Sequence, residues 1–124
     1  MQDIFKLRVY SPVQETLAEV AKIDYEQNML YDVNGEGFNI DVVVLNQCTG
    51  VKDMDGKLIY VGDILKIKPF IGKHFIIGRV ERSHAGSFGV DGYGTLQAGM
   101  STEYKVIGNI YENRELLNEF SRTD

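Results

Sequence analysis

Short apolar runs that alternate with polar residues constrain the fold of this chain more than any other feature. Near the N-terminus, Phe5, Leu7 and Val9 alternate with two cationic residues. A period of two is typical of a half-buried β-strand, because successive side chains of a strand point to opposite faces of its sheet. Similar short segments recur up to Tyr111, separated by turns that contain glycine, aspartate or asparagine. We therefore expect a mainly β protein.

The segment that follows the first strand has two interpretations. Ser11-Pro12-Val13-Gln14 resembles a helix start, with serine as N-cap, proline at the first helical position and glutamine two residues later. Alternatively, Leu17, Ala21 and Ile23 lie at even spacing, as in a strand, and the proline then belongs to a hairpin loop. Spacing alone leaves both interpretations open.

Two later segments carry clearer signals. The run Val42-Val43-Val44-Leu45 is β-branched and apolar, which favours a strand that is covered on both faces. Near the C-terminus, Asn113 is a suitable N-cap, and Leu116, Leu117 and Phe120 form the apolar stripe of a helix of two turns. Because so short a helix is marginal alone, we expect it to dock on the sheet or on another subunit.

Size and composition indicate one globular domain over residues 1–124. The single cysteine, Cys48, excludes an internal disulfide. The apolar runs are far shorter than the roughly 20 residues needed to cross a bilayer, and no signal peptide is visible. These features predict a cytoplasmic protein that does not enter a membrane.

The sequence offers no convincing catalytic or metal site. Asp53-Met54-Asp55-Gly56 begins like a calcium loop but lacks the third ligand and the closing glutamate, so a hairpin turn explains it better. Cys48 could be a nucleophile with His74 or His84 as its base, yet no cysteine-enzyme signature surrounds it. We therefore expect no catalytic residue, no metal, no cofactor, no small-molecule substrate and no enzymatic activity.

Charge is unevenly distributed along the chain. The formal net charge is −5, which argues against nucleic acid as a partner. Between Ile64 and His84, however, five cations stand against the single acid Glu81 and give this segment a net charge of +4. This segment is a candidate anion or nucleic-acid site, a complement to an acidic neighbouring subunit, or simply a solvated strand face; its cations are Lys66, Lys68, Lys73, Arg79 and Arg82.

Two blocks of sequence are specific as wholes. The block from Asn46 to Leu65 contains Thr49-Gly50, Lys52-Asp53, Asp55-Gly56-Lys57 and Gly62-Asp63-Ile64, and it resembles the core signature of the YopX family of phage and prophage proteins. The block from Val106 to Leu117 is similar to the C-terminal end of that family. Val61 stands where the family usually has glutamate, and Arg114 where it often has proline. The resemblance implies a phage or prophage origin, a hairpin through Ser11 to Glu15, and no known activity or catalytic residue.

The resemblance and the residue patterns together give an expected architecture. We predict an N-terminal β-hairpin region over about 1–48, a small SH3-like barrel over about 49–112 and a C-terminal helix over about 113–121. In the barrel-like part, Gly62-Asp63 would turn the chain into the strand Ile64–Ile67, and Gly78–Val80 would be its antiparallel return. Asp53, Asp55 and Asp63 are interpreted as residues that form turns.

For function, we expect a non-enzymatic module that self-associates into a homo-oligomer in the host bacterial cell. The alternative is nucleic-acid binding through the Lys66–Arg82 face, with Phe70, Phe75 or Tyr93 stacking on bases.

Overall fold

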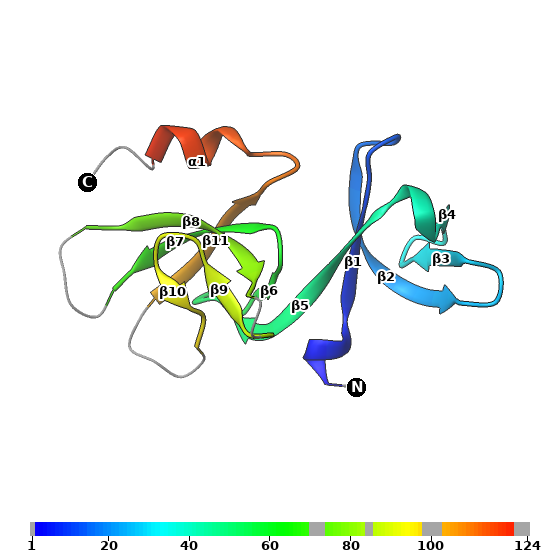
Figure 1. The fold of residues 1–124 in the computed structure, drawn as a ribbon, viewed down its shortest axis with the longest axis horizontal. Helices are drawn as coiled ribbons and strands as arrows, with labels where there is room; N and C mark the ends of the chain where they lie inside the picture. The colour runs from blue at the N-terminus through cyan, green and yellow to red at the C-terminus, as the bar shows by residue number, and fades with distance from the viewer. Residues whose placement is uncertain (1, 70–73, 84–85, 98–102, 121–124) are drawn as a thin grey trace. The chain divides into compact units, whose positions relative to one another are not determined.

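The chain divides into two compact units in the computed structural model, Met1–Cys48 and Thr49–Asp124. The structure describes residues 2–69, 74–83, 86–97 and 103–120, without the side chains of residues 119 and 120. Most regular structure in the described residues is β-strand, and a short α-helix lies close to the C-terminus (Figure 1). The prediction of a mainly β protein is therefore confirmed.

The first unit is built on antiparallel strands. They follow one another in space as β4-β3-β2-β1-β5. Its small core consists of Val9, Leu30 and Phe38, which are at most 7% exposed. The elements are the 3-10 helix η1 (Asp3–Phe5), β1 (Leu7–Ser11), β2 (Thr16–Asp24), β3 (Met29–Asp32), β4 (Gly37–Asn39), the 3-10 helix η2 (Ile40–Val42) and the first part of β5 (Val44–Lys52).

The ambiguous segment after β1 forms a hairpin. Ser11 pairs with Thr16 in the β1–β2 register, and the Ser11 carbonyl accepts a hydrogen bond of 2.7 Å from the Glu15 amide. Glu15 has a φ of 55°, a left-handed conformation that a continuing helix does not permit. The helix interpretation is therefore wrong, and the hairpin implied by the family resemblance is confirmed.

Two apolar segments of the first unit differ from prediction. The first strand begins only at Leu7, because residues 3–5 form η1 and leave Phe5 69% exposed. The run from Val42 to Leu45 is not a strand covered on both faces, since η2 occupies its start and Val42, Val44 and Leu45 are 60%, 43% and 38% exposed. The β-branched composition correctly favours extended chain from Val44 onward, but it carries no information about what covers that chain.

The second unit contains a five-stranded antiparallel sheet of order β10-β9-β8-β7-β11. Its core includes Ile59, Leu65, Ile67, Val80 and Tyr104, all at most 5% exposed. Its elements are the last part of β5, then β6 (Leu58–Tyr60), β7 (Asp63–Lys68), β8 (Ile76–Arg82), β9 (Phe88–Val90), β10 (Gly94–Thr95), β11 (Glu103–Asn109) and α1 (Glu115–Phe120).

The expected SH3-like barrel is only partly matched. β7 pairs with β8 in antiparallel register, with Leu65 opposite Gly78, so the predicted return strand is confirmed. Within the described residues, however, β10 and β11 are opposite edges of an open sheet and do not close a barrel. The SH3-like assignment is therefore not confirmed.

The C-terminal helix forms as predicted, but the residue expected to cap its N-terminus has another role. α1 packs against β8, and Leu116 and Leu117 are half-buried (Figure 1). The Asn113 side chain does not cap the helix, because its oxygen accepts a hydrogen bond of 3.2 Å from the Asn109 amide instead. The predicted apolar role of the Phe120 side chain lies outside the described residues. Within the described part of the chain, no helix has the length and apolar character needed to cross a bilayer.

Candidate functional site

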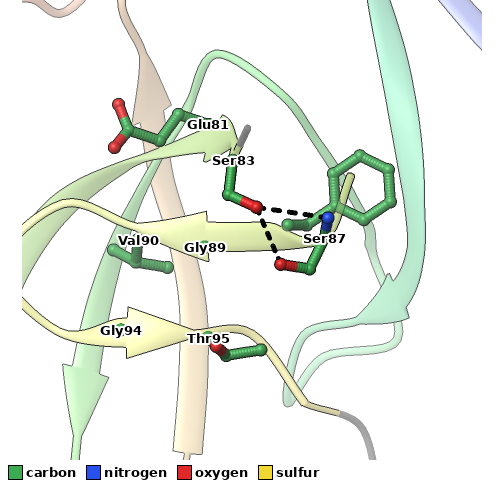
Figure 2. A pocket seen from close by; sticks show the side chains of 8 residues that line it. Glu81, Ser83, Ser87, Gly89, Val90, Gly94 and Thr95 are labelled. Carbon is green, nitrogen blue, oxygen red and sulfur yellow. Dashed lines mark hydrogen bonds between the residues drawn. The ribbon is translucent and has the colours of Figure 1, made fainter. Parts of the chain in front are cut away.

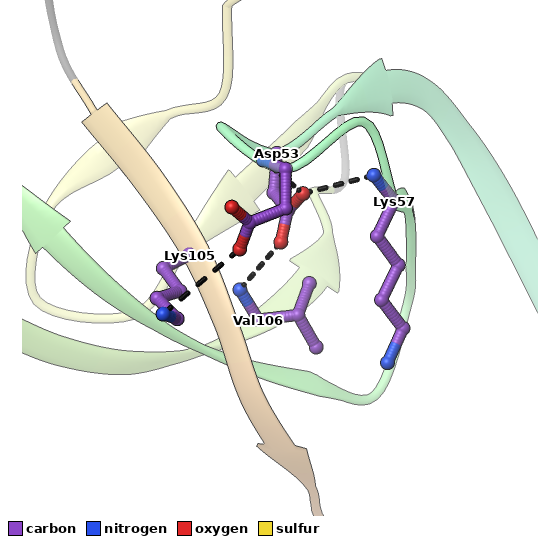
Figure 3. Close-up of polar contacts among 5 residues, drawn as sticks. Asp53, Lys57, Lys105 and Val106 are labelled. Atoms are coloured by element: carbon purple, nitrogen blue, oxygen red, sulfur yellow. Dashed lines mark hydrogen bonds and ion pairs between the residues drawn. The ribbon is translucent and has the colours of Figure 1, made fainter.

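The Asp53 side chain binds three backbone amides of the second unit. It lies in the turn between β5 and β6 and is 8% exposed. Its Oδ1 accepts hydrogen bonds of 2.9 Å from the amides of Asp55 and Lys57, and its Oδ2 accepts one of 3.0 Å from the Val106 amide on β11 (Figure 3). The Met54 amide also donates to the Tyr104 carbonyl at 2.8 Å. The turn therefore covers the outer edge of β11.

The electrostatics of Asp53 follow from these contacts. Burial alone raises the pKa of a carboxyl group, because it disfavours the charged form. The amides of Val106, Lys57 and Asp55 and the nearby Lys57 charge outweigh that effect and lower the pKa of Asp53 below its ordinary value. Asp53 is thus a structural carboxylate, and the prediction that it forms a turn is confirmed.

The same turn occurs in the first unit. Asp32 Oδ1 accepts hydrogen bonds of 2.9 Å from the amides of Asn34 and Glu36, and Gly35, like Gly56, has a positive φ. The amide that follows Asp32, that of Val33, donates to a neighbouring strand at the Glu19 carbonyl. The shared pattern Asp-x-Asx-Gly-x is visible in the sequence and could have identified both turns.

The predicted basic residues do not all share one surface. Lys66 and Lys68 on β7 and Arg79 on β8 lie on one face of the five-stranded sheet, because Lys66 is opposite Ile77, and Ile64 is opposite Arg79. Arg82 alternates with Arg79 and lies on the other face, opposite Phe88. Lys73 lies outside the described residues.

The structure adds Lys105 to the basic face, which we define as Lys66, Lys68, Arg79 and Lys105. Lys105 lies directly opposite Lys66 in the β7–β11 register, a pairing that sequence analysis missed because it depends on strands about 40 residues apart. The ammonium group of Lys66 lies 4.0 Å from the centre of the Phe75 ring.

Acidic groups accompany the basic face. The Lys105 ammonium nitrogen lies 3.9 Å from an Asp55 carboxylate oxygen, and Arg79 Nε lies 3.8 Å from a Glu81 carboxylate oxygen. Glu103 stands opposite Lys68. Four cations against three acids give this face a net charge of only +1, much less than the +4 of the sequence segment.

The aromatic residues expected to stack on bases do not all lie beside the basic face. Phe75 is 51% exposed. Tyr93 packs on the core of the second unit and meets the Tyr104 ring edge-on at 6.3 Å. Phe70 lies outside the described residues. Phe75 is therefore the aromatic side chain that the structure places beside the basic face.

A shallow hollow of about 240 Å³ lies over β8, β9 and β10. The hydroxyl groups of Ser83 and Ser87 lie 2.8 Å apart at its rim, and the Ser87 amide donates to the Ser83 oxygen at 3.2 Å (Figure 2). Glu81 is the charged residue among its lining side chains. The serine pair closes the hairpin between β8 and β9, a structural use of both hydroxyl groups.

The candidate nucleophile and bases do not form a described site. Cys48 is fully buried, and His74 is exposed in the second unit. His84 lies outside the described residues. Among the residues that the structure describes, no group of three or more His, Cys, Asp or Glu side chains could hold a metal ion.

Comparison with known proteins places the chain in a family. Among solved structures it is similar to protein EF1440 from Enterococcus faecalis, with 22% sequence identity, a TM-score of 0.62, and coverage of 90% of this chain and 96% of that chain. At this identity the likeness establishes the fold alone. None of the curated proteins matches the chain. A family model described as YopX protein matches residues 7–118, nearly the whole length, and the chain therefore belongs to the YopX family.

Proposed function

We propose that this protein is a non-enzymatic accessory factor of a phage or prophage that acts in the host cytoplasm by self-association. The observation that carries the proposal is the distribution of exposed apolar side chains. Ten large apolar residues are exposed in the described part of the chain, and eight of them belong to Met1–Cys48. Apolar side chains that one unit leaves in solvent are available for contact with another copy of the chain.

The chemistry of the candidate nucleophile supports a non-enzymatic role. A catalytic cysteine must be accessible and reactive as a thiolate. Cys48 is 0% exposed, which suits a small core residue. The carboxylate of Asp53, whose pKa is lowered, is occupied in accepting hydrogen bonds from backbone amides.

Sedimentation velocity at tens of micromolar protein tests self-association. We expect a concentration-dependent rise in the weight-average sedimentation coefficient above that of a 14.0 kDa monomer. A sedimentation coefficient that stays at the monomer value over the whole concentration range would remove self-association from the proposal.

Nucleic-acid binding is the second candidate function. The observation that favours it is the half-exposed Phe75 ring beneath the Lys66 ammonium group, since single-strand binders combine cations with stacking aromatic residues. We expect any such binding to weaken steeply with salt and to be reduced by Phe75→Ala or Lys66→Glu. Lys22→Glu, which changes an exposed lysine of the first unit, is the matched control. Absence of binding to a labelled oligonucleotide at about 50 mM salt rules this function out.

A further inference from the structure

The turn that joins β3 to β4, which we call the Asp32 turn, contains an asparagine followed by a glycine. Asn34 and Gly35 are both exposed, and of the seven asparagines in the sequence Asn34 is the one that precedes glycine. Glycine has no Cβ atom to shield its backbone nitrogen. A Cβ atom built at Gly35 would meet no described atom within 4 Å, so the turn is open around this residue.

An asparagine–glycine pair can rearrange without an enzyme. The backbone nitrogen of Gly35 gives up its proton to a base in the solvent and bonds to the side-chain carbonyl carbon of Asn34. The bond from that carbon to the side-chain nitrogen breaks, and ammonia leaves with a proton taken from water. Water then opens the cyclic imide at either of its carbonyl carbons, which gives aspartate or isoaspartate at position 34. The net change is the replacement of ammonia by water.

The folded turn restrains the nitrogen that must attack. The Gly35 amide donates a hydrogen bond of 3.0 Å to the Asp32 carbonyl. The amides on either side of it, those of Asn34 and Glu36, both donate to Asp32 Oδ1 at 2.9 Å. An amide that already donates gives up its proton less readily, because the hydrogen bond is lost with the proton. The attack therefore requires local opening of the turn.

We propose that Asn34 is a site of spontaneous deamidation and that the hydrogen bonds to Asp32 set its rate. An aspartate at position 34 reproduces the pattern of the other turn, Asp53-Met54-Asp55-Gly56. An isoaspartate instead lengthens the main chain before Gly35 by a carbon atom, which displaces the following amides from Asp32. Either product adds a negative charge to Met1–Cys48, where eight acids and three cations already give a net charge of −5.

Peptide mapping by mass spectrometry, after incubation of the full chain in mildly alkaline buffer, tests the site. We expect the peptide that contains Asn34 to gain the mass difference between an amide and an acid, and to contain both aspartate and isoaspartate. Asn39 is the internal control, because it is exposed in the same unit but precedes the β-branched Ile40. A glutamate-specific protease separates the two sites by cutting after Glu36. Conversion of Asn34 that is no faster than that of Asn39 overturns the proposal.

The dependence on Asp32 is tested by substitution. Asp32→Ala removes both hydrogen bonds to the carboxylate, so we expect Asn34 to convert about tenfold faster at the same pH. Asp24→Ala is the matched control, because it removes a bond of the same kind, from the Gln27 amide at 3.1 Å, in another turn of the first unit. This control should convert at the rate of the unmodified chain. Equal rates in Asp32→Ala and the unmodified chain overturn the role of the turn.

Urea supplies a measurement that does not depend on the fold of a variant. In the unmodified chain, Asn34 should convert faster in a urea concentration that unfolds the protein than in native buffer of the same pH, because the turn is then open. If Asp32→Ala loses its circular dichroism spectrum, this comparison decides. A rate in urea that equals the native rate shows that the turn does not restrain Asn34, and it overturns the proposal.

Discussion

Asp53 joins parts of the second unit that are distant in sequence. Its carboxylate binds two amides of its own turn and one amide of β11, 53 residues further along the chain. A polar group with this many partners cannot be replaced without leaving buried donors unpaired. The family signature around Asp53 therefore has a structural explanation.

Asp53→Asn is predicted to lower the free energy of unfolding by roughly 1–3 kcal/mol, because the amide group offers one acceptor oxygen where the carboxylate offers two. Urea denaturation measures the loss. Asp55→Asn is the control: that side chain is 63% exposed in its ion pair with Lys105, so a change within about 0.5 kcal/mol is expected. Equal losses in the two variants would contradict the assigned role of Asp53.

The same substitution should alter the acid response of the protein. The pKa of Asp53 is lower in the folded than in the unfolded state, so its carboxylate stabilises the fold fully above about pH 5. That contribution is lost as the pH falls below about 4, towards the folded pKa, because the unfolded chain then binds the proton more readily. Urea midpoints between pH 3 and 7 should therefore fall less steeply with acid in Asp53→Asn than in the unmodified chain.

The sequence indicates the Asp53 turn but not its partner. Aspartate followed by an Asx residue and glycine is a local sequence pattern that is typical of a turn. The hydrogen bond to Val106 depends on the register of β11, which is set by contacts with β7 far away in sequence. Lys105 was missed for the same reason.

At the scale of elements, Gly78 lets β8 approach a neighbouring segment closely. A Cβ atom there would overlap the Asp91 carbonyl oxygen and lie 2.8 Å from a Val90 methyl group. The glycine thus lets β8 and the end of β9 approach each other. The overlap with Asp91 involves a backbone atom, which cannot move aside as the end of a side chain can.

Gly78→Ala is predicted to destabilise the chain by about 1–3 kcal/mol, as overpacking of a close contact does. Thermal or urea denaturation gives the measurement. Gly37→Ala serves for comparison, because its Cβ would meet the flexible Tyr31 side chain, whose nearest atom is 3.0 Å away. The smaller loss should belong to Gly37→Ala, and the reverse order would show that the Asp91 contact does not limit β8.

Whether a segment forms a strand or a helix was easier to predict than how far its side chains are buried. Period-two alternation identified strands, and the short C-terminal helix was visible from its apolar stripe. The run from Val42 to Leu45 was wrongly expected to be covered, because β-branched residues favour extended chain whether or not a neighbour covers it. Its exposure is visible only in the folded chain, where Val42, Val44 and Leu45 are all more than a third exposed.

At the scale of the whole molecule, charge divides between the two units. Met1–Cys48 carries the entire net charge of −5, since Thr49–Asp124 contains ten cations and ten acids. On the basic face the fold adds the acids Asp55 and Glu103 to Glu81, which the basic segment already contains, so the net charge of this face is only +1. Strand alternation also sends Arg82 to the opposite face, which a linear count of charges cannot anticipate.

The link between Asp53 and β11 has a consequence for synthesis of the chain. Proteins leave the ribosome N-terminus first, so the Asp53 turn emerges while its partner at Val106 has not yet been made. Closing so long a loop also carries an entropic cost that local hairpins avoid. We therefore expect the first unit and the β5–β6 turn to take shape early, and the last strand to be locked in place only when translation is nearly complete.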